Sequence, residues 1–113
     1  LTSLAGDKSA DVRQVVAYNP SAPADVLEAL AHDQEATVRA AVARHPRIPP
    51  GALAMLAEDE SEEVRENLAS NPEATAEVLA TLAGDEGFYV RMSVASHPRT
   101  PLSVLLNLLH EQD

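Results

Sequence analysis

The residues of this chain that could take part in chemistry return at one fixed interval. An aspartate and, six residues later, an arginine recur every 26 residues, at Asp7, Asp33, Asp59 and Asp85 and at Arg13, Arg39, Arg65 and Arg91. Each arginine follows a valine, so its stem can lie along an apolar core while the guanidinium reaches a carboxylate or a helix-end carbonyl. We therefore predict structural pairs, within a copy or between neighbouring copies, rather than a binding stripe.

A second column places asparagine or histidine directly before a proline, at Asn19, His45, Asn71 and His97. Two histidines could suggest a metal site, but they lie two copies apart. Because packed helices are about 8–10 Å apart, the two rings would be roughly 20 Å apart, too far to share an ion. We expect these side chains to bond backbone groups at the turn into the proline, and we predict neither a metal nor a cofactor.

Other catalytic arrangements are weak in this sequence. There is no cysteine, which excludes disulfides and thiolate chemistry and fits a cytoplasmic location. No glycine-rich phosphate loop and no HExxH motif occurs. Ser96 adjoins His97, but sequence neighbours are no nucleophile–base pair without matching geometry. The paired carboxylates of Glu62 and Glu63 lie in a highly charged stretch that we expect to face solvent. We predict that the protein is not an enzyme.

The charge balance narrows the classes of partner. The net charge is −10, and only eight lysines and arginines are present, scattered along the chain. Binding a polyphosphate requires many cationic contacts, so nucleic acid and anionic membranes are disfavoured, as is a nucleic-acid repair enzyme of the helical-repeat type. The sequence contains no run of about 18 apolar residues, so it predicts no membrane span.

The elements that must position these residues also repeat every 26 positions. We predict one domain, made of copies 1–26, 27–52, 53–78 and 79–104 with a partial copy at 105–113. Two leucine columns recur at this interval: Leu1, Leu27, Leu53, Leu79 and Leu105, then Leu4, Leu30, Leu56, Leu82 and Leu108. Each copy holds two helix signals of eight or nine residues, as at 10–18 and 23–31. Helices this short are unstable alone and must stack on their neighbours, as in a solenoid.

The expected helix ends follow from proline and glycine. Pro23, Pro49 and Pro101 suit the first helical turn, where a missing N–H has no intrahelical partner. Gly6 and Gly84 stand just past a helix end, where we expect the left-handed conformation. The proline after the Asn/His column ends the other helix, because the residue before proline is disfavoured in the helical region. One helix of each copy could be 3₁₀ rather than α, and the sequence leaves open which.

The unit Leu-x-x-Leu-Ala-x-Asp-x-x-x-x-Val-Arg-x-x-Val-Ala-x-Asn/His-Pro-x-x-Pro resembles the leucine-rich repeat variant family over essentially the whole chain. The resemblance implies a right-handed superhelix of alternating α and 3₁₀ helices in two layers, distantly similar to HEAT and armadillo solenoids. The family has no single activity, so the resemblance informs the fold more than the function. Two departures are mild: Thr75 replaces the second proline of the third copy, and the fifth copy covers only its first helix.

The copies differ most in the third and fourth units. The third copy contains eight carboxylates and one arginine, a net charge of −7, while the fourth places Phe88 and Tyr89 where other copies have no aromatic residue. We expect both groups in the link between the two helices. An aromatic anchor beside an acidic rim predicts a site for a basic peptide or protein, made of Glu60, Glu62, Glu63, Glu66, Phe88 and Tyr89. Alternatively, Phe88 fills a local gap and the acidic run keeps the domain soluble.

A second class of function is structural. The fifth copy is richer in leucine than its equivalents, at Leu105, Leu106, Leu108 and Leu109. These residues could pack as a terminal helix or form a self-association face, because the end units of solenoids need a cap. The chain would then be a spacer or a dimerising fragment of a larger protein. We place a non-catalytic protein-binding scaffold first and this structural role second, and the sequence leaves the oligomeric state open.

Overall fold

The computed structural model describes residues 6–110, which fold into eight α-helices. They are α2 (Ala10–Tyr18), α3 (Ala24–Leu30), α4 (Ala36–Ala43), α5 (Pro50–Leu56), α6 (Glu62–Ala69), α7 (Ala76–Ala83), α8 (Phe88–Ser96) and α9 (Leu102–His110). The expectation of a 3₁₀ helix in each copy is wrong for the described residues. Hydrogen bonds of the i→i+3 type occur as single turns at helix ends, such as Asn19 N–H to the Val16 carbonyl, and in the links, such as Ala22 N–H to the Asn19 carbonyl.

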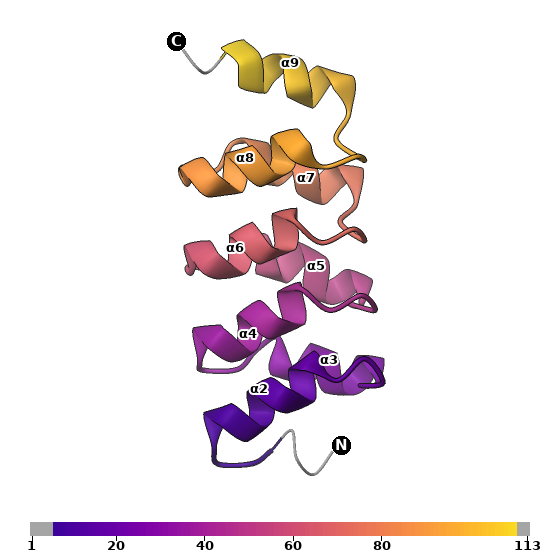
Figure 1. Cartoon of the computed structure of the whole chain (residues 1–113), viewed down its shortest axis with the longest axis vertical. Coiled ribbons are helices and arrows are strands. Elements are labelled where there is room, and N and C mark those ends of the chain that lie inside the picture. The colour runs from indigo at the N-terminus through magenta and orange to yellow at the C-terminus, as the bar shows by residue number, and fades with distance from the viewer. Residues whose placement is uncertain (1–5, 111–113) are drawn as a thin grey trace.

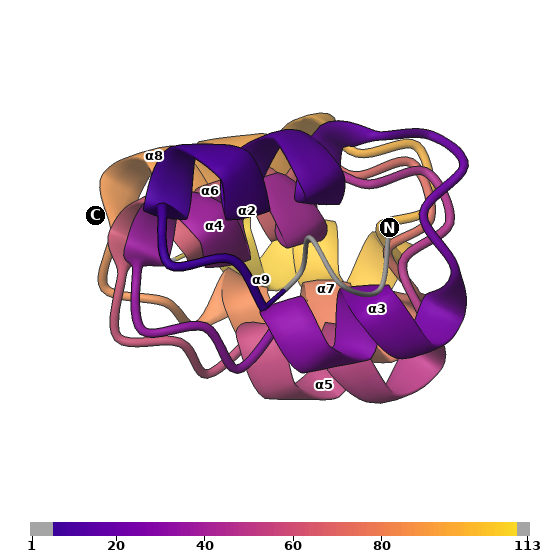
Figure 2. The same ribbon diagram turned by 90° about the horizontal axis from the view of Figure 1, so that it is seen from below.

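The helices stack in two layers along one axis (Figures 1 and 2). The first layer contains α2, α4, α6 and α8, and the second contains α3, α5, α7 and α9. The stack measures 48 × 20 × 17 Å. Each helix contacts its neighbours in sequence and the equivalent helix one copy away, which is the contact pattern of an α-solenoid. This fold class is confirmed, while the right-handed sense of the superhelix stays a prediction.

The core is made of the repeated leucine and valine columns. The first leucine column is buried at Leu27, Leu53 and Leu79. The second column, three residues later, is buried at Leu30, Leu56 and Leu82. Burying each such side chain contributes about 1.5–3 kcal/mol. Leu1 and Leu4 lie outside the described residues. Alanines fill the contacts between helices of the first layer, including Ala17, Ala41, Ala43 and Ala69, and their small side chains let these helices pack more closely than those of the second layer.

The proline positions differ slightly from the prediction. Pro23 and Pro49 stand at the N-cap, with extended backbone angles, so the helix begins one residue later. Pro50 occupies the first helical position instead. In the third copy, where proline is replaced, the Thr75 hydroxyl accepts a hydrogen bond from Val78 N–H. Proline fixes the entry conformation and threonine satisfies a free N–H, so both start the second-layer helix.

The left-handed glycines predicted at the helix ends are absent from the described part of the chain. Gly84 has φ −92° and ψ 10°, and no described glycine, Gly6 included, has a positive φ. The helix ends through a tight turn in which Asp85 N–H donates to the Leu82 carbonyl, and this turn needs no left-handed residue. No helix within residues 6–110 is both long and apolar enough to cross a membrane.

Candidate functional site

The Asp and Arg columns form a repeated clamp between neighbouring copies. Arg39 donates from Nε to Asp59 Oδ2 at 2.7 Å and from Nη2 to Asp59 Oδ1 at 3.2 Å. Its Nη1 donates at 2.6 Å to the backbone carbonyl of Asp33, in its own copy. The two side chains are only 12% and 9% exposed. One guanidinium therefore ties the loop of its own copy to the carboxylate of the next, in a bidentate geometry that favours a strong pair.

The same clamp occurs one copy before and one copy after. Arg13 pairs with Asp33 and Arg65 pairs with Asp85, with Nε–Oδ2 distances of 2.7 and 2.6 Å. Arg91 donates to the Asp85 carbonyl at 2.7 Å, and the position that would supply its carboxylate, residue 111, lies outside the described residues.

The aspartates of the clamp also hold their own loop. Asp33 Oδ1 accepts a hydrogen bond from Glu35 N–H at 2.9 Å, and Asp7 accepts one from Ser9 N–H at 2.8 Å. Burial alone raises the pKa of Asp33, but the hydrogen bonds from Arg13 and Glu35 N–H and the charges of Arg13 and Arg39 outweigh it. The net effect lowers the pKa of Asp33 below its ordinary value of 3.8. The clamp thus keeps this carboxylate ionised.

The Asn/His column forms a second ladder, parallel to the clamps. His45 Nδ1 accepts from Arg47 N–H at 2.9 Å, so Nε2 carries the proton and donates to the Asn19 carbonyl of the preceding copy at 2.8 Å. Asn71 likewise accepts from Glu73 N–H and donates to the His45 carbonyl.

His97 repeats this arrangement in the fourth copy. Its Nε2 donates to the Asn71 carbonyl at 2.7 Å, and its Nδ1 accepts from Arg99 N–H at 3.0 Å. The polar atoms of this column are therefore used inside the stack. Within residues 6–110 no three histidine, aspartate or glutamate side chains gather as a metal site would require.

A shallow groove crosses the outer face of the first layer. It consists of three hollows: one of about 240 Å³ between α2 and α4, one of about 350 Å³ between α4 and α6, and one of about 400 Å³ between α6 and α8. Arg44 lines the first and second hollows, and Ser70 and Pro72 line the second and third. Because neighbouring hollows share lining residues, they lie side by side along the first layer, and we call this row of three hollows the first-layer groove.

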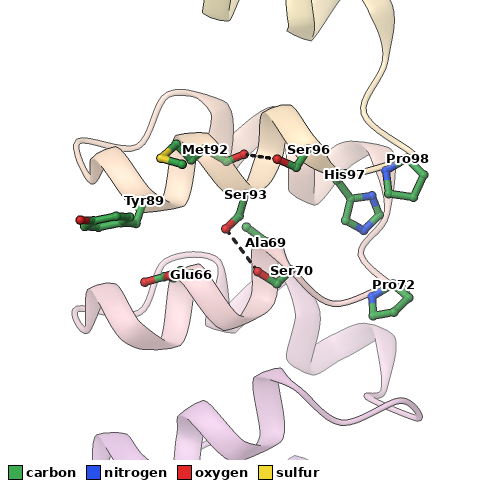
Figure 3. A pocket seen from close by; sticks show the side chains of 10 residues that line it. All are labelled: Glu66, Ala69, Ser70, Pro72, Tyr89, Met92, Ser93, Ser96, His97 and Pro98. Carbon is green, nitrogen blue, oxygen red and sulfur yellow. Dashed lines mark hydrogen bonds between the residues drawn. The ribbon is translucent and has the colours of Figure 1, made fainter.

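The α6–α8 end of the groove combines apolar and acidic groups (Figure 3). Tyr89 and Met92 project from α8, and Glu66 lies on α6. Tyr89 is 59% exposed and Met92 is 48% exposed. The Ser70 hydroxyl on the α6 side donates a hydrogen bond to the Ser93 hydroxyl of α8 at 3.2 Å.

The structure brings only two of the six predicted binding residues into this hollow. Glu66 and Tyr89 line it, whereas Glu60, Glu62, Glu63 and Phe88 do not. The expectation that these groups occupy the link is wrong for five of the six: α6 contains Glu62, Glu63 and Glu66, and the first turn of α8 contains Phe88 and Tyr89. The two rings meet edge to face at 5.4 Å.

Glu62 lies against the start of α8 rather than in the groove. A Cβ placed on Gly87 would come within 2.7 Å of Glu62 Oε2, so the glycine makes room for this carboxylate. A negative charge beside a helix N-terminus is favourable. Glu62 therefore has a structural environment of its own.

Three groove residues were missed by the sequence analysis: Tyr18, Arg44 and Met92. A signal for them exists. Tyr18 and Arg44 share one repeat column with Ser70 and Ser96, and Met92 shares another with Gln14, Ala40 and Glu66. In both columns the residue type changes in size and charge among the copies. Variation at such sites marks a solvent-facing surface that differs from copy to copy.

Within residues 6–110, the two layers of α-helices that repeat every 26 residues define a short α-solenoid of helical repeats. The family model of the leucine rich repeat variant matches residues 10–35 and 36–61, two consecutive units of the stack. These two units are therefore similar to this family, as the repeat columns predicted. Each matched unit begins at a first-layer helix. The repeat is therefore the same 26-residue unit, with its start placed at residue 10 rather than at Leu1. No curated protein and no solved structure matches the chain.

Proposed function

We propose that the protein is a non-catalytic scaffold that binds a basic segment of another protein in the first-layer groove. The observation that supports this most is the exposure of Tyr89 and Met92 beside Glu66 in the α6–α8 hollow. Aromatic residues and methionine are enriched at the cores of protein interfaces. Methionine also adapts its shape to different apolar partners.

The charge distribution favours a basic partner. The clamps use the arginines of the repeat, so they neutralise aspartates inside the stack and leave the exposed glutamates uncompensated. Glu62 and Glu63 are exposed at the start of α6, and Glu66 lines the groove one turn later. A negative surface of this kind speeds the encounter with a positively charged partner and disfavours acidic ones.

The geometry of the hollow supports binding rather than catalysis. The Ser96 hydroxyl donates to the Met92 carbonyl at 3.0 Å. Both ring nitrogens of His97 are engaged by backbone groups, so this histidine is not available as a base for the neighbouring hydroxyl. Helical repeats of this class offer extended surfaces for binding.

Selection from a library of random twelve-residue peptides displayed on phage tests the proposal. We expect selected peptides to be enriched in lysine or arginine beside apolar residues. Tyr89→Ala should weaken their binding about tenfold, as loss of an interface anchor does, and Glu66→Gln should weaken it by a few fold. Glu77→Gln is the matched control, because Glu77 is an exposed glutamate on α7 in the second layer. Equal affinity of all these variants would contradict the proposal.

A second candidate function is self-association through the last helix. Leu102, Leu106 and Leu109 of α9 are all exposed, whereas Leu108 packs against the stack. An exposed apolar stripe of this kind is typical of a contact surface. Sedimentation across a wide concentration range tests this, because a self-associating chain follows mass action. Replacing Leu106 and Leu109 by glutamate should then abolish the concentration dependence, and a monomer at every concentration would exclude this role.

A further inference from the structure

We infer that the first-layer groove takes an extended segment with charges of opposite sign at its two ends. A basic residue would lie at the α6–α8 hollow, facing Glu66, and an acidic residue at the α2–α4 hollow, facing Arg44. This inference rests on the proposed function and names the partner more closely, as a bipolar peptide segment. It is carried by the different chemistry of the two outer hollows, because Arg44 lines the α2–α4 hollow and Glu66 lines the α6–α8 hollow.

Arg44 differs from the arginines of the clamps. It stands at the C-cap of α4, is exposed, and lines two of the three hollows. Within residues 6–110 the ion pairs are those of Arg13, Arg39 and Arg65, so Arg44 belongs to none of them. Its equivalents in the third and fourth copies are serines. A cation that is not used by the stack and lines a groove is available for a carboxylate of a partner.

Each end of the groove also offers an aromatic ring. Tyr18 lines the α2–α4 hollow beside Arg44 and is 51% exposed. Tyr89 occupies the other end beside Glu66. The middle hollow is polar, with Asn67 and Ser70 in its lining. The groove therefore consists of two apolar anchors, each next to one charge, joined by a polar section that suits a peptide backbone.

The spacing of the two outer hollows, rather than that of the two rings on their outer walls, sets the length of the bound segment. The two outer hollows lie two helix spacings apart along the first layer. With about 8–10 Å between packed helices, this separation is about 16–20 Å. An extended chain advances about 3.3 Å per residue. The two apolar residues of the partner would therefore be about five or six positions apart, one beside an acidic and one beside a basic residue.

The test uses the peptides selected from the same random library against the wild-type protein. We expect an acidic and apolar pair about five or six positions from a basic and apolar pair. One selected peptide, labelled with fluorescein, is then compared with a version in which its acidic residue is lysine. Fluorescence polarisation should show about three- to tenfold weaker binding of the lysine version to the wild-type protein, and Arg44→Glu should restore it.

Arg47→Glu is the matched control, since it makes the same charge change at an exposed arginine three residues away that does not line the groove. Equal effects of Arg44→Glu and Arg47→Glu, or selected peptides without an acidic position, would overturn the bipolar segment. If Tyr89→Ala still weakens binding in that case, the proposed function stands without it. If no selected peptide depends on Tyr89 or Glu66, the proposed function and this inference are both wrong.

Discussion

Replacing Arg39 by methionine should destabilise the stack far more than any exposed arginine does. The substitution keeps the apolar stem and removes three hydrogen bonds, two to the Asp59 carboxylate and one to the Asp33 carbonyl. Of the side-chain hydrogen bonds of Asp59, the one from Ser61 N–H would then remain, at a carboxylate that is only 9% exposed in the intact protein. Removing one member of a buried ion pair costs about 3–5 kcal/mol, because the other charge stays uncompensated.

The expected loss is about 3 kcal/mol, the lower end of that range, since both side chains keep some access to water. For a domain whose total stability is about 5–15 kcal/mol, this is a large share. The melting temperature should fall by roughly 12–24 °C, at about 4–8 °C per kcal/mol for a chain of this size. Urea unfolding followed by far-ultraviolet circular dichroism measures the free energy directly.

Two further variants separate the clamp from general effects of the substitution. Arg47→Met removes an exposed arginine and should change the free energy of unfolding by no more than about 0.5 kcal/mol. The double variant Arg39→Met with Asp59→Leu removes the stranded charge as well, so it should be more stable than Arg39→Met alone. The reasoning would be refuted if Arg39→Met and Arg47→Met lost equal stability, or if the double variant lost more than the single one.

Two other outcomes follow from the same contacts. Because the pKa of Asp33 is lowered in the folded chain, its ionised form stabilises the fold at pH values above its ordinary pKa of 3.8, and this stability is lost as the pH falls through the folded pKa. Asp33→Asn should therefore lose stability less steeply than the wild type between about pH 5 and pH 2 in acid titrations. His97→Asn should be tolerated, since Asn71 fills the same column, whereas His97→Ala strands the Asn71 carbonyl and Arg99 N–H, at about 1–3 kcal/mol for each group, as thermal unfolding can measure.

The repeat period was enough to predict the helices and their stacking, because each copy repeats the same apolar columns. It left open which aspartate each arginine meets. In the sequence Arg39 stands six residues after Asp33 and twenty before Asp59. The guanidinium has enough donors for both, so it binds the carbonyl of one and the carboxylate of the other. Which atom meets which partner depends on the separation of the copies, and that separation is set by packing.

The groove could not be predicted from the differences between copies alone. Phe88 and Tyr89 are neighbours in sequence, but successive residues on a helix point about 100° apart. Tyr89 therefore lines the hollow while Phe88 does not. The prediction placed both in a link, where no helical phase would separate them. The start of α8 at Phe88 rests on the extended conformation of Gly87, which composition does not reveal.

The residues that recur in every copy and identify the repeat do not determine its binding specificity. Clamp and ladder side chains are used inside the stack, by carbonyls and carboxylates that every copy supplies. Their pattern is the same in each copy, so it offers no means to distinguish one partner from another. Specificity must then come from solvent-facing columns whose residue types change along the stack. Arg44, which lines the α2–α4 hollow, and Glu66, which lines the α6–α8 hollow, are such positions, and we expect their opposite charges to give a bound segment a direction.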